Sequence, residues 1–193
     1  QLKPDRLVTF SYAHVPWVKP HQTTLEKIGL PTPEEKLAMF GEASRIMSEE
    51  GGYTVIGLDH FALSDDELSL ALKNGTLHRN FQGYCTRETT GQVYAFGMSA
   101  ISQMQEAYAQ NHKDIKTYIT KINGQQPATE KGYVLSVEEQ YIREIIQDLM
   151  CNNYLDWNAT AQRLNTTAGE LKKITEYTSE KMEPFLNDGL ITL

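Results

Sequence analysis

The chain has 193 residues, of which 40% are hydrophobic and 22% are charged, and its formal net charge is −7. This composition is ordinary for a globular protein long enough to bury a core. The negative charge disfavours nucleic acid and anionic membranes as partners, no apolar run of roughly 18 residues predicts a membrane span, and two widely separated cysteines fit a reducing, cytoplasmic compartment.

The first third of the chain predicts strands that alternate with a helix. Residues 7–12 and 53–58 are rich in β-branched and aromatic side chains and predict two strands. Between them, residues 32–51 begin with a Thr-Pro-Glu-Glu capping box and end at glycine, as a helix does. This order predicts a parallel sheet, whose functional residues gather at the carboxyl ends of strands. Residues 12–14 and 59–61 occupy such ends.

The middle of the chain predicts a mixture of elements. Residues 64–67 form a second capping box, with Ser64 as the expected N-cap. Residues 77–102 predict two extended segments around a polar loop. Residues 103–123 show a helical pattern, and residues 130–132 predict a turn.

The last third predicts helices. A third capping box at residues 136–139 opens a helix, and residues 154–190 predict two or three more, with Asn158 and either Thr166 or Thr167 as N-caps. The expected apolar face of the first of these helices consists of Ile142, Ile145, Ile146, Leu149 and Met150. The helix pair and the terminal Gly-Leu-Ile-x-Leu run resemble a winged-helix module. A change in composition near residue 124 predicts two domains, residues 1–124 and 125–193.

Residues 77–86 mix polar and aromatic side chains in one short run that reads LHRNFQGYCT. The run neither alternates as a plain strand does nor repeats as a helix face does. Polar groups beside aromatic rings that exclude water are typical of a binding site. The residues alone leave a second interpretation open, in which Phe81 is a core aromatic, Gln82 a surface amide, and His78 and Arg79 belong to an ordinary ion-paired surface.

The same segment carries a family resemblance, together with six further motifs in the same order along the chain. HRNFQGY resembles the corresponding segment of the oxygen-independent coproporphyrinogen III oxidases, which are radical S-adenosylmethionine (SAM) enzymes of haem biosynthesis. The other motifs that resemble this family are YAH-x-P at 12–16, GY-x-x-IGLDHFA at 52–62, DDEL at 65–68, GMSAIS at 97–102, YAQN at 108–111 and LMCN at 149–152.

The resemblance implies a fold and an activity. The fold class is α/β, with the last strands and helices of a partial radical SAM (β/α) barrel followed by a mostly helical, winged-helix-like domain. The implied reaction is the oxidative decarboxylation of two propionates of coproporphyrinogen III to the vinyl groups of protoporphyrinogen IX. The implied cofactors are SAM and a 4Fe–4S cluster, and an external donor would supply electrons. Cys85 and Cys151 are too few to hold that cluster, so we expect a C-terminal fragment that is inactive alone.

The resemblance also implies particular site residues. Ala13 and Ile101 correspond to residues that contact SAM, while Phe81 and Gln82 correspond to residues at the SAM and substrate site. The neighbouring His78 and Arg79 are candidates for binding the substrate's propionates, because a guanidinium can bind a carboxylate through two hydrogen bonds. We assign no catalytic group and expect no metal ligands in this chain.

Two alternatives stay open. The haem chaperone of the same superfamily binds haem without decarboxylation, but its segment reads closer to HN-x-x-YW than to the sequence at 78–84. A non-catalytic interaction module built on the winged-helix-like end is the other alternative. Residues 154–193 carry about as many acidic as basic side chains, which disfavours DNA as the partner of such a module.

Overall fold

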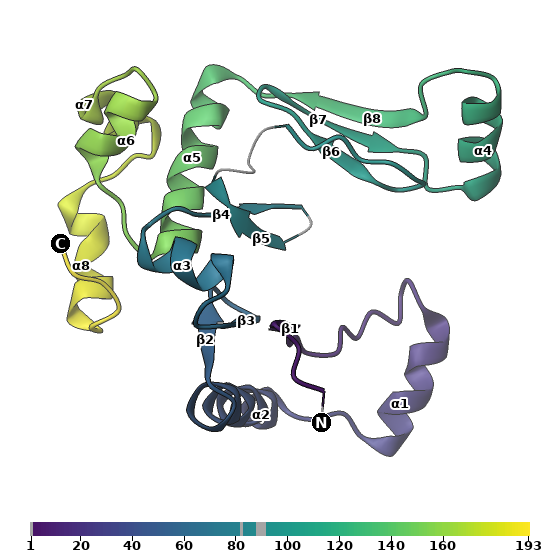
Figure 1. Ribbon diagram of the computed structural model, residues 1–193, viewed down its shortest axis with the longest axis horizontal. Coiled ribbons are helices and arrows are strands. Elements are labelled where there is room, and N and C mark those ends of the chain that lie inside the picture. The colour runs from purple at the N-terminus through teal and green to yellow at the C-terminus, as the bar shows by residue number, and fades with distance from the viewer. Residues whose placement is uncertain (1, 82, 88–91) are drawn as a thin grey trace. The chain divides into compact units, whose positions relative to one another are not determined.

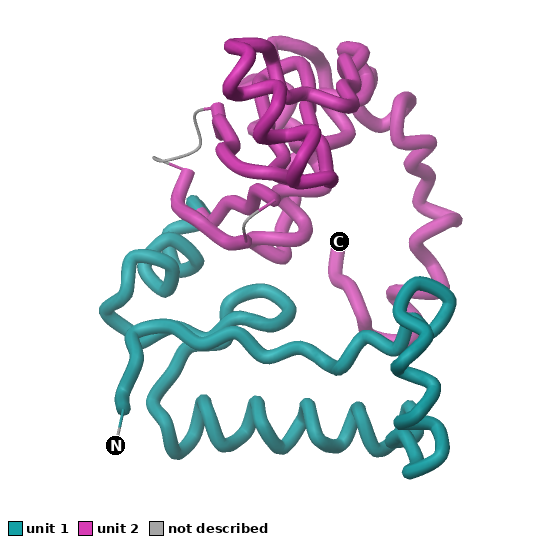
Figure 2. Tube along the Cα trace, turned by 90° about the vertical axis from the view of Figure 1, so that its right-hand side faces the viewer, with its two compact units in different colours: residues 1–76 teal, residues 77–193 magenta. Residues whose placement is uncertain are grey.

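The computed structural model describes residues 2–81, 83–87 and 92–193 (Figure 1). Its residues divide into two compact units, 1–76 and 77–193 (Figure 2). The domain boundary expected near residue 124 stays a prediction. None of the helices in the described ranges combines the length and the apolar character that a bilayer crossing needs.

Unit 1 contains a three-stranded sheet in the order β1-β3-β2, formed by β1 (Arg6–Val8), β2 (Tyr53–Ile56) and β3 (His60–Leu63). The expected parallel pairing is wrong, because β3 lies in the middle and pairs antiparallel with both neighbours. The reason is a turn directly after β2. Gly57 adopts a left-handed conformation with φ 60°, which lets the chain reverse at once into β3.

The helices of unit 1 begin where local capping places them. The Thr32 hydroxyl accepts a hydrogen bond from the Glu35 amide, and the Glu35 carboxylate accepts one from the Thr32 amide, so this capping box is confirmed. The cap expected at Ser64 is wrong: the Asp66 carboxylate accepts from the Leu68 amide at 2.8 Å and begins the helix. The helical elements are η1 (Pro20–Gln22), α1 (Thr23–Ile28), α2 (Pro33–Arg45), the π-turn η2 (Ile46–Glu50) and α3 (Glu67–Lys73).

The core of unit 1 lies between the sheet and α3. Ile56, Phe61 and Leu68 are almost completely buried there, and α3 contacts both β2 and β3. By contrast, none of the described side chains of α1 or α2 is buried.

Unit 2 begins with a hairpin of β4 (Leu77–Asn80) and β5 (Gly83–Thr86), followed by an antiparallel sheet of β6 (Ile101–Gln103), β7 (Ala107–Asn111) and β8 (Thr129–Val134). Two expectations are wrong here. The helix predicted from residue 103 is confined to α4 (Ile115–Asn123), and the turn predicted at residues 130–132 lies inside β8. Every residue of β7 is half-buried and every residue of β8 is exposed. Neither strand alternates between buried and exposed side chains, and it is this alternation that produces the apolar–polar pattern by which a strand is predicted from sequence.

Four helices complete unit 2. The capping box at Ser136 and the N-cap at Thr167 are confirmed, whereas Asp156 caps the helix that was expected to begin at Asn158. The buried centre of this region is formed by Ile145 and by residues of the two helices that follow. The helices are α5 (Val137–Asn152), α6 (Trp157–Arg163), α7 (Ala168–Ile174) and α8 (Ser179–Asn187).

Helix α5 does not bury the face that its sequence predicts. Of the five expected apolar residues only Ile145 is buried, while Ile146 is 53% exposed. Asp148 and Cys151 are buried instead. The helix therefore packs through a partly polar face, and it contacts strand β4 of the β4–β5 hairpin.

Candidate functional site

The β4–β5 hairpin is held against α5 by side-chain amides. The Gln147 amide nitrogen donates to the Arg79 carbonyl at 2.6 Å, and the Gln147 amide oxygen accepts from the Arg79 amide at 3.1 Å. Asn152 donates to the Leu77 carbonyl at 3.3 Å. These contacts occupy backbone groups of β4 on the side away from β5, so the strand that carries the signature sequence is fixed to a long helix.

His78 and Arg79 point to opposite faces of this hairpin, because neighbouring strand residues alternate. The Arg79 guanidinium lies 5.3 Å from the centre of the Tyr84 ring, in a cation–π arrangement. His78 is only 9% exposed. Burial is the main cause that lowers the pKa of His78 below its ordinary value, so its imidazole is neutral at pH 7. The two side chains therefore lie in different surroundings, one buried and the other stacked on an aromatic ring.

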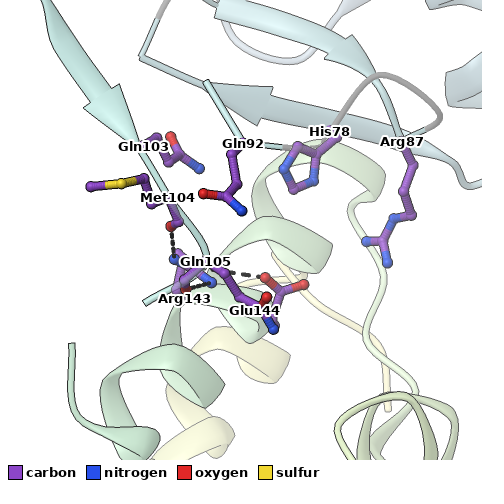
Figure 3. A pocket seen from close by; sticks show the side chains of 8 residues that line it. All are labelled: His78, Arg87, Gln92, Gln103, Met104, Gln105, Arg143 and Glu144. Carbon is purple, nitrogen blue, oxygen red and sulfur yellow. Dashed lines mark hydrogen bonds and ion pairs between the residues drawn. The ribbon is translucent and has the colours of Figure 1, made fainter. Parts of the chain in front are cut away.

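His78 lies at the wall of a cavity of about 390 Å³ within unit 2 (Figure 3). The side chains come from the end of β5, from the segment around β6 and from α5, and most of them are polar. The lining residues are His78, Arg87, Gln92, Gln103, Met104, Gln105, Arg143 and Glu144.

Arg143 forms one side of the cavity. Its guanidinium donates to the Gln105 carbonyl at 3.0 Å and to the Met104 carbonyl at 3.5 Å. Its Nε atom lies 3.6 Å from a carboxylate oxygen of Glu144, and both side chains are largely buried. These contacts connect α5 to the segment that follows β6.

Arg87, on another side of the cavity, is oriented by a buried carboxylate. Asp148 accepts a hydrogen bond from Arg87 at 3.0 Å, from the Thr160 hydroxyl at 2.9 Å and from Arg163 at 2.6 Å. Two guanidiniums therefore share one carboxylate. The network also joins α5 and α6 to the end of β5.

Phe81 and Ile101 lie in connected parts of unit 2. Phe81 occupies the turn between β4 and β5, is 54% exposed, and meets the Tyr108 ring edge-on with centroids 5.3 Å apart. Tyr108 belongs to β7, which pairs with β6, where Ile101 is the first residue. The structure therefore brings the hairpin turn to the sheet that carries Ile101. Gln82 lies outside the described residues.

Ala13 belongs to unit 1, in the exposed segment after β1. Its carbonyl accepts a hydrogen bond from the Gln22 amide at 3.2 Å, and the same Gln22 side chain accepts from the Val15 amide at 2.7 Å. His14 contacts Glu26 at 2.8 Å. This long loop is therefore tied to the short helices that follow it.

The described part of the chain offers no set of three or more His, Cys, Asp or Glu side chains placed to hold a metal ion. Cys151 is buried, and burial raises the pKa of its thiol to about 11, which disfavours the thiolate that metal binding requires. An iron–sulfur cluster needs several thiolates, and this chain has only two cysteines. Its own residues do not fit such a cluster.

Sequence reasoning missed three residues of this region, namely Arg143, Gln147 and Asp148. The available signal was their spacing. Arg143 and Gln147 are four positions apart on α5, as are Glu144 and Asp148, so they form a polar stripe on the helix. The spacing alone does not indicate that this stripe contacts the hairpin.

Comparison with known proteins gives a consistent result. No protein-family model matches the chain. It is 43% identical over 151 residues to the oxygen-independent coproporphyrinogen III oxidase of Synechocystis, an alignment that covers 78% of this chain and 32% of the relative. It is 36% identical over 194 residues to the oxidase of the same name from Escherichia coli K12, covering 99% of this chain and 41% of the relative.

A solved structure supports the same relationship. The coproporphyrinogen III oxidase from Escherichia coli, described as a radical SAM enzyme, matches with a TM-score of 0.87 and 36% identity, over 98% of this chain and 43% of that one. The chain spans about two fifths of the length of this solved structure, and about two fifths of the length of the Escherichia coli K12 relative found by sequence. On these findings, the chain belongs to the family of the oxygen-independent coproporphyrinogen III oxidases.

Proposed function

We propose that this chain is part of an enzyme that converts two propionates of coproporphyrinogen III to the vinyl groups of protoporphyrinogen IX by oxidative decarboxylation. The observation that carries the proposal is the β4–β5 hairpin. Its HRNFQGY sequence is fixed to α5 and lies beside a polar cavity, in a chain that aligns over nearly its whole length with relatives of that name.

SAM, when bound, supplies the hydrogen-abstracting chemistry of this proposal. Phe81, exposed at the hairpin turn, offers an aromatic surface to it, and Ile101 offers a half-buried apolar side chain. Ala13 contributes backbone on an exposed loop with only a methyl group to obstruct approach, and Gln82 is the fourth proposed contact. The cluster thiolates and the external electron donor belong to other polypeptide, because the cysteines of this chain do not fit the cluster.

The substrate carries four carboxylates, whereas the chain carries a net charge of −7. Binding therefore requires local cations and hydrogen-bond donors, for which His78 and Arg79 are the proposed contacts. In this proposal the protein is cytoplasmic and has neither a nucleic-acid nor a membrane partner. Residues 1–124 complete a radical SAM barrel, and residues 125–193 form a winged-helix-like helical domain. The chain alone is inactive in this proposal.

The test replaces the matching part of the Escherichia coli oxidase with this chain and measures protoporphyrinogen formation under anaerobic conditions with a chemical reductant. We expect turnover by the chimera and none by the free chain. A matched chimera with Phe81→Ala should lose activity, because the substitution removes the aromatic ring that is proposed to contact SAM. A folded chimera that binds haem but releases no CO₂ from coproporphyrinogen would instead favour the haem-chaperone alternative.

A further inference from the structure

The cavity beside β4 contains a polar atom that the protein itself leaves without a partner. The Nδ1 atom of His78 is buried and makes no hydrogen bond within the described part of the chain. Water does not replace the missing partner readily, because the residue is only 9% exposed. A buried nitrogen without a partner is costly. Since His78 also lines the cavity, a group bound in that space is able to supply the missing contact.

The charges around the cavity favour a negative group. Among its described lining residues, Arg87 and Arg143 are positive and Glu144 is negative. Asp148, which holds Arg87, is also paired with Arg163. Two guanidiniums against one carboxylate in the described lining are notable in a chain of net charge −7.

We propose that this cavity binds one carboxylate group of a small-molecule ligand. The His78 Nδ1–H and the Arg143 guanidinium are its principal donors, and the amides of Gln92 and Gln103, which also line the cavity (Figure 3), are additional donors. Asp148 is a positioning residue that keeps Arg87 at the cavity. The ligand's identity rests on the proposed function: there, the carboxylate is a propionate of the porphyrinogen.

A monoanion fits this lining better than the neighbouring classes of ligand. A phosphate dianion would approach the Glu144 carboxylate with two negative charges, twice the repulsion that a carboxylate meets. A neutral amide would not form an ion-paired hydrogen bond with the Arg143 guanidinium. In this proposal His78 acts together with Arg143, which lines the same cavity 65 positions along the sequence. The adjacent Arg79 instead stacks on Tyr84 on the other face of the hairpin.

The test uses the whole chain and sodium propionate, with propionamide as a neutral molecule of the same shape. Saturation-transfer NMR measures binding of each, and the ¹⁵N signals of histidine-labelled chain locate it. We expect propionate to bind, to shift His78 and to leave exposed His21 unchanged, while propionamide binds at least about tenfold more weakly, as expected for loss of a charged hydrogen bond. Equal binding of both molecules, or no shift of His78, would overturn the inference.

Variants separate the cavity from nonspecific charge. Arg143→Gln should weaken propionate binding roughly tenfold or more. The control Arg45→Gln also removes one guanidinium, but from an exposed site on α2, and should bind as the original chain does. Because Arg143 also contacts two carbonyls, His78→Phe provides a second variant that keeps a buried ring; it too should lose binding while remaining folded by circular dichroism. Unchanged binding in either cavity variant would contradict the assignment.

Coproporphyrin III, the stable oxidised form of the proposed substrate, links the two proposals. It should displace propionate from the chain if a propionate arm occupies the cavity. If propionate binds as expected but coproporphyrin III does not compete, the carboxylate site stands and the proposed function is contradicted. If propionate itself does not bind, the inference about the cavity fails while the chimera experiment still decides the function.

Discussion

His78 shows at the scale of one residue how burial creates a pH-dependent contribution to stability. Desolvation is the largest cause that lowers its pKa; Arg87 and Arg143 lower it further, whereas Glu144 and Asp148 oppose the shift. In the unfolded chain the pKa of a histidine is about 6.5. The folded state therefore binds a proton less readily than the unfolded state does. The resulting stability is present above about pH 6.5 and is lost as pH falls from there towards the folded pKa.

His78→Phe should remove this contribution, because phenylalanine does not titrate. We expect the free energy of unfolding of the original chain to fall more steeply than that of the variant as the pH is lowered below about 6.5, measured by urea denaturation at each pH. Parallel curves for the original chain and His78→Phe would contradict the prediction.

At the scale of elements, Lys172 connects the last helices of unit 2. Its ammonium lies 5.6 Å from the centre of the Trp157 ring and 5.4 Å from that of the Tyr177 ring. The two rings also meet edge-on at 5.1 Å. One lysine of α7 therefore links the start of α6 with the residues that precede α8.

Lys172→Met keeps the aliphatic stem and removes the charge. We expect this change to lower the free energy of unfolding by about 0.5–1 kcal/mol, the usual strength of an exposed cation–π contact. Lys173→Met is the matched control on the same helix, because Lys173 is exposed; its effect should stay within about 0.5 kcal/mol. Equal effects of the two substitutions in chemical denaturation would show that the rings do not stabilise the charge.

The elements that sequence reasoning predicts well are those decided by neighbouring residues. Thr32 and Ser136 bond to the amide three positions later, so their capping boxes are visible in the sequence itself. Strand β7 pairs with β8, although helix α4 separates the two strands along the chain. No local sequence pattern specifies β8 as the pairing partner of β7. The family motif singled out residues 77–86 but not their hairpin pairing, and the packing of this hairpin depends on contacts such as Gln147 with Arg79, 68 positions apart.

At the scale of the whole molecule, the two units differ in how their helices are packed. Helix α2 has a complete capping box but no buried side chain among its described residues, and Leu37 on it is 72% exposed. Helix α5 buries Ile145, Asp148 and Cys151. A cap contributes about 1 kcal/mol, whereas most of the stability of a protein helix comes from tertiary packing.

Hydrogen exchange followed by mass spectrometry should reveal this difference in the isolated chain. We expect the backbone amides of α2 to exchange faster than those of α5, because opening α2 exposes little additional apolar surface. Peptides from the polar ends of both helices serve as internal controls for fraying. Equal protection of the two helices would mean that a surface covers α2 in solution, for instance in a self-associated form detectable by sedimentation.

The bidentate contact of Gln147 with Arg79 has a consequence for how molecules of this protein meet one another. The outer rim of a two-stranded ribbon is a template on which a further extended polypeptide readily grows, and natural proteins usually block such growth with charge, proline or a bulge. Here the side-chain amide of Gln147 in α5 forms the two backbone hydrogen bonds at Arg79 that a neighbouring strand would otherwise form, and Asn152 donates to the Leu77 carbonyl. Resistance to fibril formation at this rim is therefore conditional on α5 staying docked.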